Sequence, residues 1–307
     1  MPLLGILIFE RVYRRREVTL MINGKRIGVV VLNYNDADTT DILLRDISLY
    51  PLIDHIVIVD NWSTDHSFEY LKKWQSNRID VLQTDKNGGY SYGNNVGAFF
   101  LIKKYNIDVL FIVNPDVIFT ESFLQQIIDD MDSTSAKAAS GYMVMPKHVP
   151  PIVINKKINT WKRETLECTI FLKKIFPYRV DSVTPHMGIQ EVEWLPGSLF
   201  AIDAKVYTEL GGLDDSVFLF FEEQILGRKF IDKGYKMILD TNISYYHNHS
   251  ISINKSIKRL EQVKQLYRSK YYFYTNYERI SLVQKLLMKL AIHYGIFSRR
   301  LIYKLIK

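Results

Sequence analysis

The stretch Val109–Asp116 reads VLFIVNPD, an apolar and mostly β-branched run that ends at a turn-forming Asn-Pro-Asp. Apolar runs without polar alternation are typical of parallel strands that are covered on both faces. Pro115 keeps the preceding residue extended and cannot donate a sheet hydrogen bond, so the strand should stop there. Asp116 is then expected at the carboxyl end of a central strand, where open α/β sheets bind ligands. The alternative is that Asp116 belongs to a turn and caps a helix that begins at Thr120 or Glu121.

Three similar runs lie upstream, at Ile27–Leu32, His55–Val59 and Ile79–Gln83. Each is followed by polar or glycine-rich residues and then by helical spacing, and Ser63 or Thr64 is expected to cap the second helix. This alternation predicts an α/β fold with a doubly wound, mostly parallel sheet and flanking helices. Because the carboxyl ends of parallel strands share one edge, four polar side chains should converge in one crevice. They are Asn35, Asp60, Asn87 and Asp116.

The second half of the chain has a less regular pattern. Residues 147–190 contain several prolines and basic residues, which predicts an insertion or a lid. The further expected elements are a strand in Val192–Ile202, a helix from Glu222 to about Lys233, and strands at Lys236–Leu239 and Ile243–Tyr246. Glycine can end a helix, so Gly234 marks the expected end of the helix that starts at Glu222 and Glu223.

The composition is that of an ordinary globular protein. Of 307 residues, 47% are hydrophobic and 24% charged, which allows one sizeable core and an appendage. The single cysteine, Cys168, excludes an internal disulfide framework and favours a reducing, cytoplasmic compartment. The formal net charge of +7 indicates anionic partners.

The two ends of the chain differ from its middle. Residues 255–307 hold thirteen Lys or Arg, only two acidic residues, and leucines and tyrosines at helical spacing. They predict a basic amphipathic helical segment, which either lies on the anionic inner face of the plasma membrane or packs as a cap on the sheet. Residues 1–26 are expected to be an extension. Its apolar Met1–Phe9 is too short to span a bilayer, so it is either a small interfacial anchor or precedes a true start at Met21.

Several polar residues at the strand ends suggest chemistry with a phosphorylated ligand. A strand-end carboxylate such as Asp116 can hold Mg²⁺ or Mn²⁺, which fill their remaining positions with phosphate oxygens and water. Asp60 and Asn61 could hydrogen-bond a base or ribose, or merely form a helix cap. The backbone N–H groups of Asn87–Gly89 could meet a phosphate or a sugar, although glycines there also suit a plain turn.

Other nucleotide and nucleic-acid folds fit less well. The residues after the first strand, at 32–38, read LNYNDAD, which is neither a dinucleotide fingerprint nor a phosphate-binding Walker loop. The sequence also has no zinc-ligand spacing and no recognisable nucleic-acid module, so we expect no nucleic-acid partner.

Six motifs in order resemble family 2 glycosyltransferases of the GT-A fold. They are VVVLNYN at 29–35, IVIVDNxSxD at 56–65, NGGYxxGNN at 87–95, NPD at 114–116, WLPGS at 194–198 and FFEE at 220–223. The resemblance covers residues 27–252 and is closest to bacterial rhamnosyltransferase-like enzymes of O-antigen and capsule assembly. It implies a catalytic unit at 27–254, with a nucleotide-sugar half at 27–118 and an acceptor half at 119–254.

The resemblance also implies a reaction. The enzyme would be metal-dependent and inverting, and it would transfer a sugar to a glycan or lipid-linked acceptor. The first candidate donor is dTDP-rhamnose, and the second is a UDP-hexose or UDP-galactofuranose. The alternatives are a sugar nucleotidyltransferase, which should have an Arg-containing glycine-rich loop after the first strand, and a non-catalytic scaffold attached to the membrane by the basic tail.

Roles carry over to individual positions. Glu223 matches the catalytic base, with Glu222 next, and Asp116 and His247 match the metal site, with His249 a nearby rival. Asn114 stands where the family has the first Asp of Asp-x-Asp, and Ile225 and Leu226 stand where a further Asp is usual. The residues expected to bind the nucleotide sugar are Asn33, Tyr34, Asn35, Asp60, Asn61, Asn87, Gly88, Asn95, Asn114, Trp194 and Gly197.

Overall fold

The computed structural model describes residues 24–146, 153–170, 175, 181–248 and 259–305. Nearly all of the N-terminal extension 1–26, and the rival ligand His249, lie outside this part of the chain. Over the residues described, no helix combines the length and the apolar character needed to cross a membrane.

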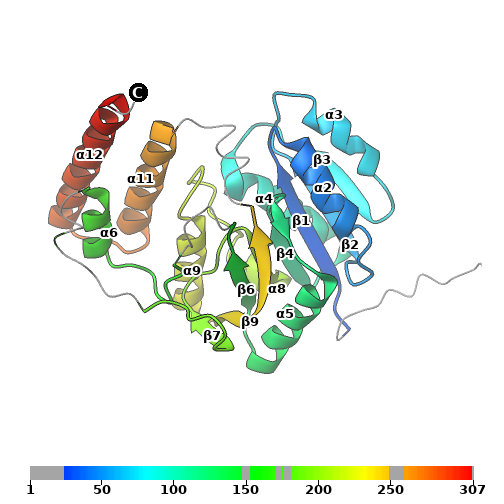
Figure 1. Ribbon diagram of the computed structural model, residues 1–307. Coiled ribbons are helices and arrows are strands. Elements are labelled where there is room, and N and C mark those ends of the chain that lie inside the picture. The colour runs from blue at the N-terminus through cyan, green and yellow to red at the C-terminus, as the bar shows by residue number, and fades with distance from the viewer. Residues whose placement is uncertain (1–23, 147–152, 171–174, 176–180, 249–258, 306–307) are drawn as a thin grey trace, which may run out of the picture.

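The first half of the chain forms the parallel part of the sheet, in the order β3-β2-β1-β4. Helices lie between successive strands, as the alternating pattern predicted (Figure 1). The doubly wound α/β architecture is therefore confirmed. The elements are β1 (Ile27–Asn33), α2 (Ala37–Ile47), β2 (His55–Asp60), α3 (Ser67–Leu71), a 3-10 turn (Lys72–Trp74), β3 (Ile79–Gln83), α4 (Gly89–Tyr105) and β4 (Val109–Val113).

The second half extends the sheet in mixed orientation, in the order β4-β8-β6-β9-β5, with β7 also paired to β9. Strand β8 is antiparallel to both β4 and β6, whereas β6 and β9 are parallel. Its elements are β5 (Val117–Ile118), α5 (Glu121–Thr134), β6 (Ala138–Val144), α6 (Trp161–Cys168), β7 (Ile189–Val192), β8 (Leu199–Asp203), α8 (Ala204–Glu209), α9 (Glu222–Lys233), β9 (Met237–His247), α11 (Arg259–Asn276) and α12 (Leu282–Leu305).

Two strand predictions differ from the structure. The strands expected at Lys236–Leu239 and Ile243–Tyr246 are one strand, β9, in which the register shifts opposite Gly141 and Tyr142. The bulge inserts extra residues that interrupt the apolar pattern without ending the strand. The region 192–202 is instead two strands, because residues 193–198 leave the sheet as a loop between β7 and β8.

Two capping predictions are also resolved. Thr120 caps α5 by accepting a hydrogen bond from the amide of Phe123, so the alternative that Asp116 caps this helix is wrong. Ser63 and Thr64 do not cap α3, which begins at Ser67. There the Asp65 carboxylate accepts the Ser67 amide at 2.9 Å.

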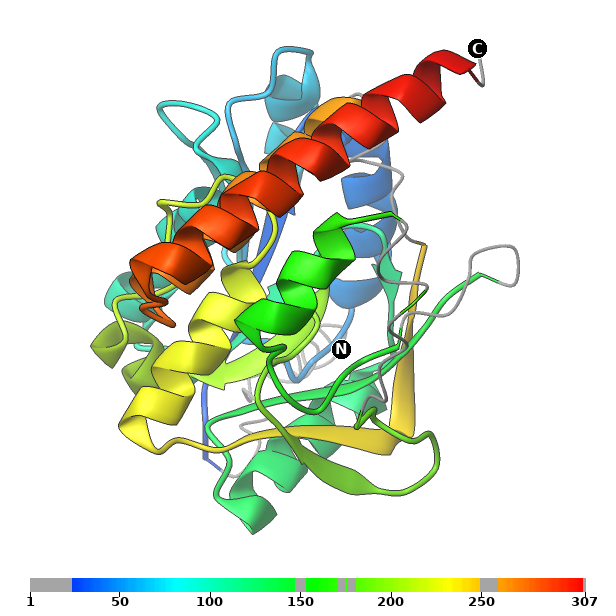
Figure 2. The same cartoon turned by 90° about the vertical axis from the view of Figure 1, so that its left-hand side faces the viewer.

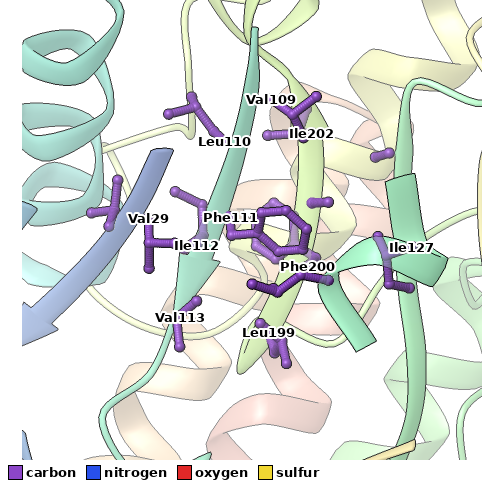
Figure 3. Close-up of a cluster of buried hydrophobic side chains, with 14 of the residues drawn as sticks. Val29, Val109, Leu110, Phe111, Ile112, Val113, Ile127, Leu199, Phe200 and Ile202 are labelled. Carbon is purple, nitrogen blue, oxygen red and sulfur yellow. The ribbon is translucent and has the colours of Figure 1, made fainter. Parts of the chain in front are cut away.

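Strand β4 lies at the centre of the main hydrophobic core. Its residues are at most 3% exposed, and Figure 3 shows them between Val29 of β1 and Leu199, Phe200 and Ile202 of β8. The prediction of a strand buried on both faces is therefore confirmed.

A second hydrophobic cluster joins the C-terminal helices to the rest of the molecule. Phe273 and Tyr274 of α11 and Met288 of α12 are buried with Phe221 and Ile225 of the α9 region. Helix α12 also lies against α6, and it is the outermost element of that side (Figure 2). The basic C-terminal segment is thus helical as predicted, and one face of it packs on the protein.

Replacing Phe111 by alanine should lower the free energy of unfolding by about 3–5 kcal/mol, because a fully buried aromatic ring would leave a cavity. The matched control is Phe297→Ala, since Phe297 is 62% exposed and its loss should change stability by less than about 0.5 kcal/mol. Urea unfolding of both variants measures this difference. Equal destabilisation would contradict the central position of β4.

Candidate active site

The ends of β1 and β2 are joined by a buried network of amide and carboxylate groups. The side-chain amide of Asn33 donates to Asp60 Oδ1 at 2.9 Å, and the amide N–H of Ser63 donates to Asp60 Oδ2 at 3.0 Å. Gln83 of β3 donates to the same carboxylate at 3.1 Å. Asp60 is fully buried. In this structure it ties three strand ends together, and its contact with a nucleoside stays a prediction.

A second network connects these strand ends to the glycine-rich loop. Asn61 donates to the Asn87 side chain at 3.1 Å and to the carbonyl of Gly89 at 3.0 Å. Gly89 has φ of +89°, and a Cβ there would lie 2.1 Å from the carbonyl oxygen of Phe218. Only glycine permits this approach, which brings the loop before α9 to the strand edge.

The remaining predicted residues of this region divide into two groups. Asn35 pairs with Thr64, and Tyr34 and Gly88 are partly exposed at the same edge. The Asn95 amide, by contrast, holds the backbone of Leu213 at 2.8 and 2.9 Å and accepts from Tyr207. These contacts give Asn95 a structural role, and its contact with a donor stays a prediction.

Asp116 and His247 lie side by side as predicted, because β5 pairs with the end of β9. The register sets Val117 opposite His247, and His247 Nε2 is 3.2 Å from Asp116 Oδ1. Both side chains are largely buried. The carboxylate, from the turn before β5, and the imidazole, from the end of β9, are therefore in contact.

This pair fits a divalent ion that takes its other ligands from a substrate. Over the described residues, no group of three or more His, Cys, Asp or Glu side chains is arranged to hold an ion. A site with one carboxylate and one imidazole suits Mg²⁺ or Mn²⁺, since such ions accept phosphate oxygens and water. In such a site the protein would supply two ligands, Asp116 and His247, and a bound substrate would supply others.

A chain of contacts leads from this pair to the loop 193–198. His247 Nδ1 is 3.3 Å from Met143 Sδ, which is 3.5 Å from Ser198 Oγ. Ser198 Oγ lies 2.6 Å from the hydroxyl of Tyr245. Asn114 contacts the same loop, because its backbone N–H donates a hydrogen bond to the carbonyl of Ser198 at 2.8 Å. These contacts place the NPD and WLPGS motifs next to each other.

Glu222 and Glu223 occupy the first turn of α9, at the same edge of the sheet. Tyr90 donates a hydrogen bond to the carbonyl of Gly197, and a Cβ on Gly197 would lie 2.7 Å from Glu223 Oε1. Burial is the main cause that raises the pKa of Tyr245, and both Asp116 and Glu223 raise it further. Gly197 thus lies between Tyr90 of the glycine-rich loop and Glu223 of α9.

The two glutamates differ in access. Glu222 is 4% exposed, and its Oε2 has no hydrogen-bond partner among the described residues. Burial raises the pKa of Glu222 well above its usual value, and the Glu223 carboxylate adds to this rise. Glu223 is partly exposed. Burial raises its pKa too, although the backbone N–H groups of Glu223 and Gly197 act in the opposite direction.

The backbone before α9 is strained. Phe220 and Phe221 both have φ of 69°, a region that bulky residues rarely adopt and that costs about 1–3 kcal/mol for each residue. The ring centroid of Phe221 lies 5.7 Å from the ring centroid of Phe273 and 6.3 Å from that of Tyr274. Packing against α11 thus holds the turn that sets the direction of the two glutamates.

A polar cavity of about 370 Å³ lies on the other side of the first turn of α9. Phe221 and Gln224 line it, and Gln224 Oε1 is buried with no hydrogen-bond partner among the residues described. Its charged lining residues are Arg163, Glu164 and Glu167 from α6, Lys270 from α11 and Arg299 from α12. The cavity is therefore bounded by elements outside the parallel half of the sheet.

Three residues that contribute to the site were missed by the sequence analysis. The Ser198 hydroxyl shares a hydrogen bond with the Tyr245 hydroxyl, and Tyr90 joins the glycine-rich loop to Gly197. Ser198 and Tyr90 lie inside quoted motifs. Tyr245 lies two residues before His247 on the same strand, so the alternation of side chains along β9 could have identified it. Trp194 packs against the main core beside Gly227 of α9.

The sequence matches Glycosyl transferase family 2 over residues 28–181, which is half of the chain. A relative from Haloferax volcanii, the low-salt glycan biosynthesis hexosyltransferase Agl10, is 24% identical over 198 residues. These residues are 64% of this chain and 59% of that protein.

The fold resembles several solved glycosyltransferase structures. The mannosyltransferase PcManGT from Pyrobaculum calidifontis, in complex with GDP-Man and Mn²⁺, has a TM-score of 0.56 and 13% identity, covering 96% of this chain and 80% of that one. GalNAc-T7 with UDP, GalNAc and Mn²⁺ has a TM-score of 0.56 and 14% identity, covering 89% and 56%. S. aureus TarS in complex with UDP-GlcNAc has a TM-score of 0.52 and 15% identity, covering 89% and 73%.

At these identities the structural likeness is one of fold, and it agrees with the GT-A architecture that the motifs implied. Half of the sequence matches one family, and the site geometry joins the six motifs at one edge of the sheet. The chain belongs to glycosyl transferase family 2.

Proposed function

We propose that this protein is an inverting glycosyltransferase that moves a sugar from a nucleotide diphosphate donor to an acceptor hydroxyl group. The observation that carries the proposal is that the Gly197–Ser198 loop connects the turn of Asp116 to Glu223. Ser198 accepts a hydrogen bond from the backbone N–H of Asn114, and Gly197 lies against the Glu223 carboxylate. One carboxylate comes from the nucleotide-side strand β4 and its following turn, and the other from the first turn of α9. Such an arrangement would separate Asp116, which binds the metal ion on the diphosphate, from Glu223, which accepts the proton.

Glu223 is the proposed general base. Its partly exposed carboxylate accepts the proton of the acceptor hydroxyl while that oxygen forms a bond to the anomeric carbon. The bond from the anomeric carbon to the diphosphate oxygen breaks at the same time, and the nucleoside diphosphate leaves from the opposite face. One displacement of this kind inverts the anomeric configuration. The raised pKa of Glu223 makes it a stronger base than an exposed glutamate.

Asp116 and His247 are the proposed ligands of Mg²⁺ or Mn²⁺. When bound, such an ion would neutralise charge on the leaving diphosphate. The Mn²⁺ complexes of PcManGT and GalNAc-T7 support a divalent ion in this family of folds. The ion would be held on the protein side by Asp116, with His247 completing the set.

The donor is proposed to lie over the carboxyl ends of β1, β2 and β4. Asn33, Asn35, Asp60 and the Asn87 loop form its walls, with Asn114 and Gly197 nearer to the reacting carbon. A dTDP-rhamnose donor is our first candidate and a UDP-hexose or UDP-galactofuranose the second. The solved relatives bind UDP-GlcNAc and GDP-Man, which supports a nucleotide sugar as the class of donor.

The acceptor is proposed to be a glycan or lipid-linked oligosaccharide of cell-surface polysaccharide synthesis. The polar cavity beside Gln224 supports this class, because its mixed charges and its aromatic residues Phe221 and Tyr267 suit a hydroxyl-rich ligand. The family match favours this activity over a sugar nucleotidyltransferase. Release of nucleoside diphosphate by the purified protein would exclude a non-catalytic scaffold.

Replacing Asp116 by alanine should remove the gain in donor affinity that Mn²⁺ provides, and turnover should fall by roughly a hundredfold or more. Calorimetric titration of donor with and without Mn²⁺ measures this effect. The control is Asp38→Ala, which removes an exposed carboxylate from the first turn of α2. A metal-dependent gain that survives in Asp116→Ala would contradict the metal assignment.

Glu223→Gln keeps the volume of the side chain but removes its basicity, so turnover should fall by roughly 10²- to 10⁴-fold. Donor affinity should stay near that of the wild type, since the base does not contact the nucleotide. Glu222→Gln is the matched control and should be milder, because Glu222 is almost fully buried. If Glu222→Gln proved the more damaging change at unchanged donor affinity, the base would be Glu222.

Glu222→Gln should also stabilise the protein more at pH 8 than at pH 4. The pKa of Glu222 is raised in the folded state, so above its unfolded pKa of about 4.3 the unfolded chain releases a proton that the folded chain retains. This difference lowers wild-type stability as pH rises towards the folded pKa, and glutamine abolishes it. Urea unfolding of both proteins at the two pH values tests the sign. If the two proteins differed in free energy of unfolding by the same amount at both pH values, the pKa of Glu222 would not be raised by folding.

A further inference from the structure

Helix α12 has two faces of different character. Its inner face buries Met288 and Ile292 against the rest of the protein, and a Cβ on Gly295 would lie 2.2 Å from the carbonyl oxygen of Cys168 in α6. Its outer face exposes a row of large apolar side chains. We define the α12 stripe as Leu282, Val283, Leu286, Leu287, Leu290 and Phe297, which are 47–83% exposed.

The α12 stripe is continuous along the helix. Leu282, Leu286 and Leu290 are four residues apart and Phe297 follows seven further on, so they share one side of the cylinder. Outside α12, the exposed large apolar side chains of the described residues, such as Ile42 and Ile118, are distributed over several elements. Soluble proteins rarely leave a continuous apolar surface of this kind in water without a partner for it.

The charge on α12 identifies the kind of partner. The helix carries Lys285, Lys289, Arg299, Arg300 and Lys304 and no acidic residue. At 100° per residue, Lys289 and Arg300 fall along one border of the stripe, and both are exposed. An apolar face bordered by cations is the pattern of a helix that lies in the interface of an anionic bilayer.

We propose that the α12 stripe inserts into the interfacial layer of an anionic lipid membrane, with the bordering cations on the headgroups. A second copy of the chain fits this surface less well. Two helices meeting through the stripe would bring together two sets of cations without any acidic residue on either helix to offset them. A membrane supplies both the apolar layer and the opposite charge.

The position of α12 links this surface to the cavity beside α9. Arg299 lines the cavity, while the stripe residues of the same helix are exposed. Helix α12 lies on the outside of the molecule on this side (Figure 2). Insertion of the stripe would therefore hold the cavity close to the lipid headgroups. If the cavity receives the acceptor, as the proposed function states, a lipid-linked acceptor would reach it from the membrane surface. The membrane contact itself does not depend on that function.

The test compares sedimentation of the full-length protein with vesicles of phosphatidylcholine alone and of phosphatidylcholine with phosphatidylglycerol. The wild type should bind the anionic vesicles and lose binding at high salt. Leu286→Gln/Leu290→Gln should weaken this binding about tenfold or more, since it removes apolar contact. Ile42→Gln/Leu49→Gln is the matched control on exposed residues of α2 and its C-terminal end, and it should bind as the wild type does.

A second measurement uses a variant that keeps all but one residue of the stripe. A Leu290→Cys variant labelled with an environment-sensitive dye should shift its emission to the blue on anionic vesicles, whereas Ile42→Cys should not. Cys168 is buried and stays unlabelled. Absence of both vesicle binding and the dye shift would overturn the proposal, as would equal binding by the stripe variant. So would a wild-type dimer that the stripe substitutions dissociate while no vesicles are bound. Donor hydrolysis in solution should be unaffected by these variants, which separates this result from a failure of the proposed function.

Discussion

Strand β4 is paired along both edges, parallel to β1 and antiparallel to β8, and its side chains are almost wholly removed from water. Because both edges of β4 are occupied, the residues after Val113 leave the sheet at the carboxyl end of the strand. The change from parallel to antiparallel pairing also brings the start of β8 to the end of β4, where the Asn114 amide meets the carbonyl of Ser198. The nucleotide-side motifs and the WLPGS loop thus share one edge of the sheet.

The C-terminal helices support this edge from outside the parallel half. The left-handed Phe220 and Phe221 set the start of α9, and a strained turn persists only where its surroundings hold it. Phe273 and Tyr274 of α11 provide that hold by packing on Phe221. The same cluster continues into α12. A segment that looks like an appendage in sequence therefore helps to direct the two glutamates, and it also carries the α12 stripe.

The site contains two glutamates whose ionisation costs free energy because they are buried. Two adjacent carboxylates with raised pKa values are costly to ionise away from water, and Glu222 has an oxygen that no described residue satisfies. A core chosen only for stability would not contain such a pair. The pair begins α9 near the edge where Asp116 and His247 meet, which supports the proposed role of Glu223 as the base.

The sequence by itself determined the four parallel strands, the end of β4 before Asp116 and the span of α9, and its motifs implied that Asp116 and His247 share one site. The strands and helix ends follow from local patterns, because strand runs and helix stops depend on neighbours in the chain. Only the tertiary structure decided that the backbone of Asn114 binds Ser198, that Asn95 holds Leu213, and that α12 buries one face and exposes the other. These outcomes depend on contacts between residues about a hundred positions apart. Such contacts are set by packing and register, on which local periodicity carries no information.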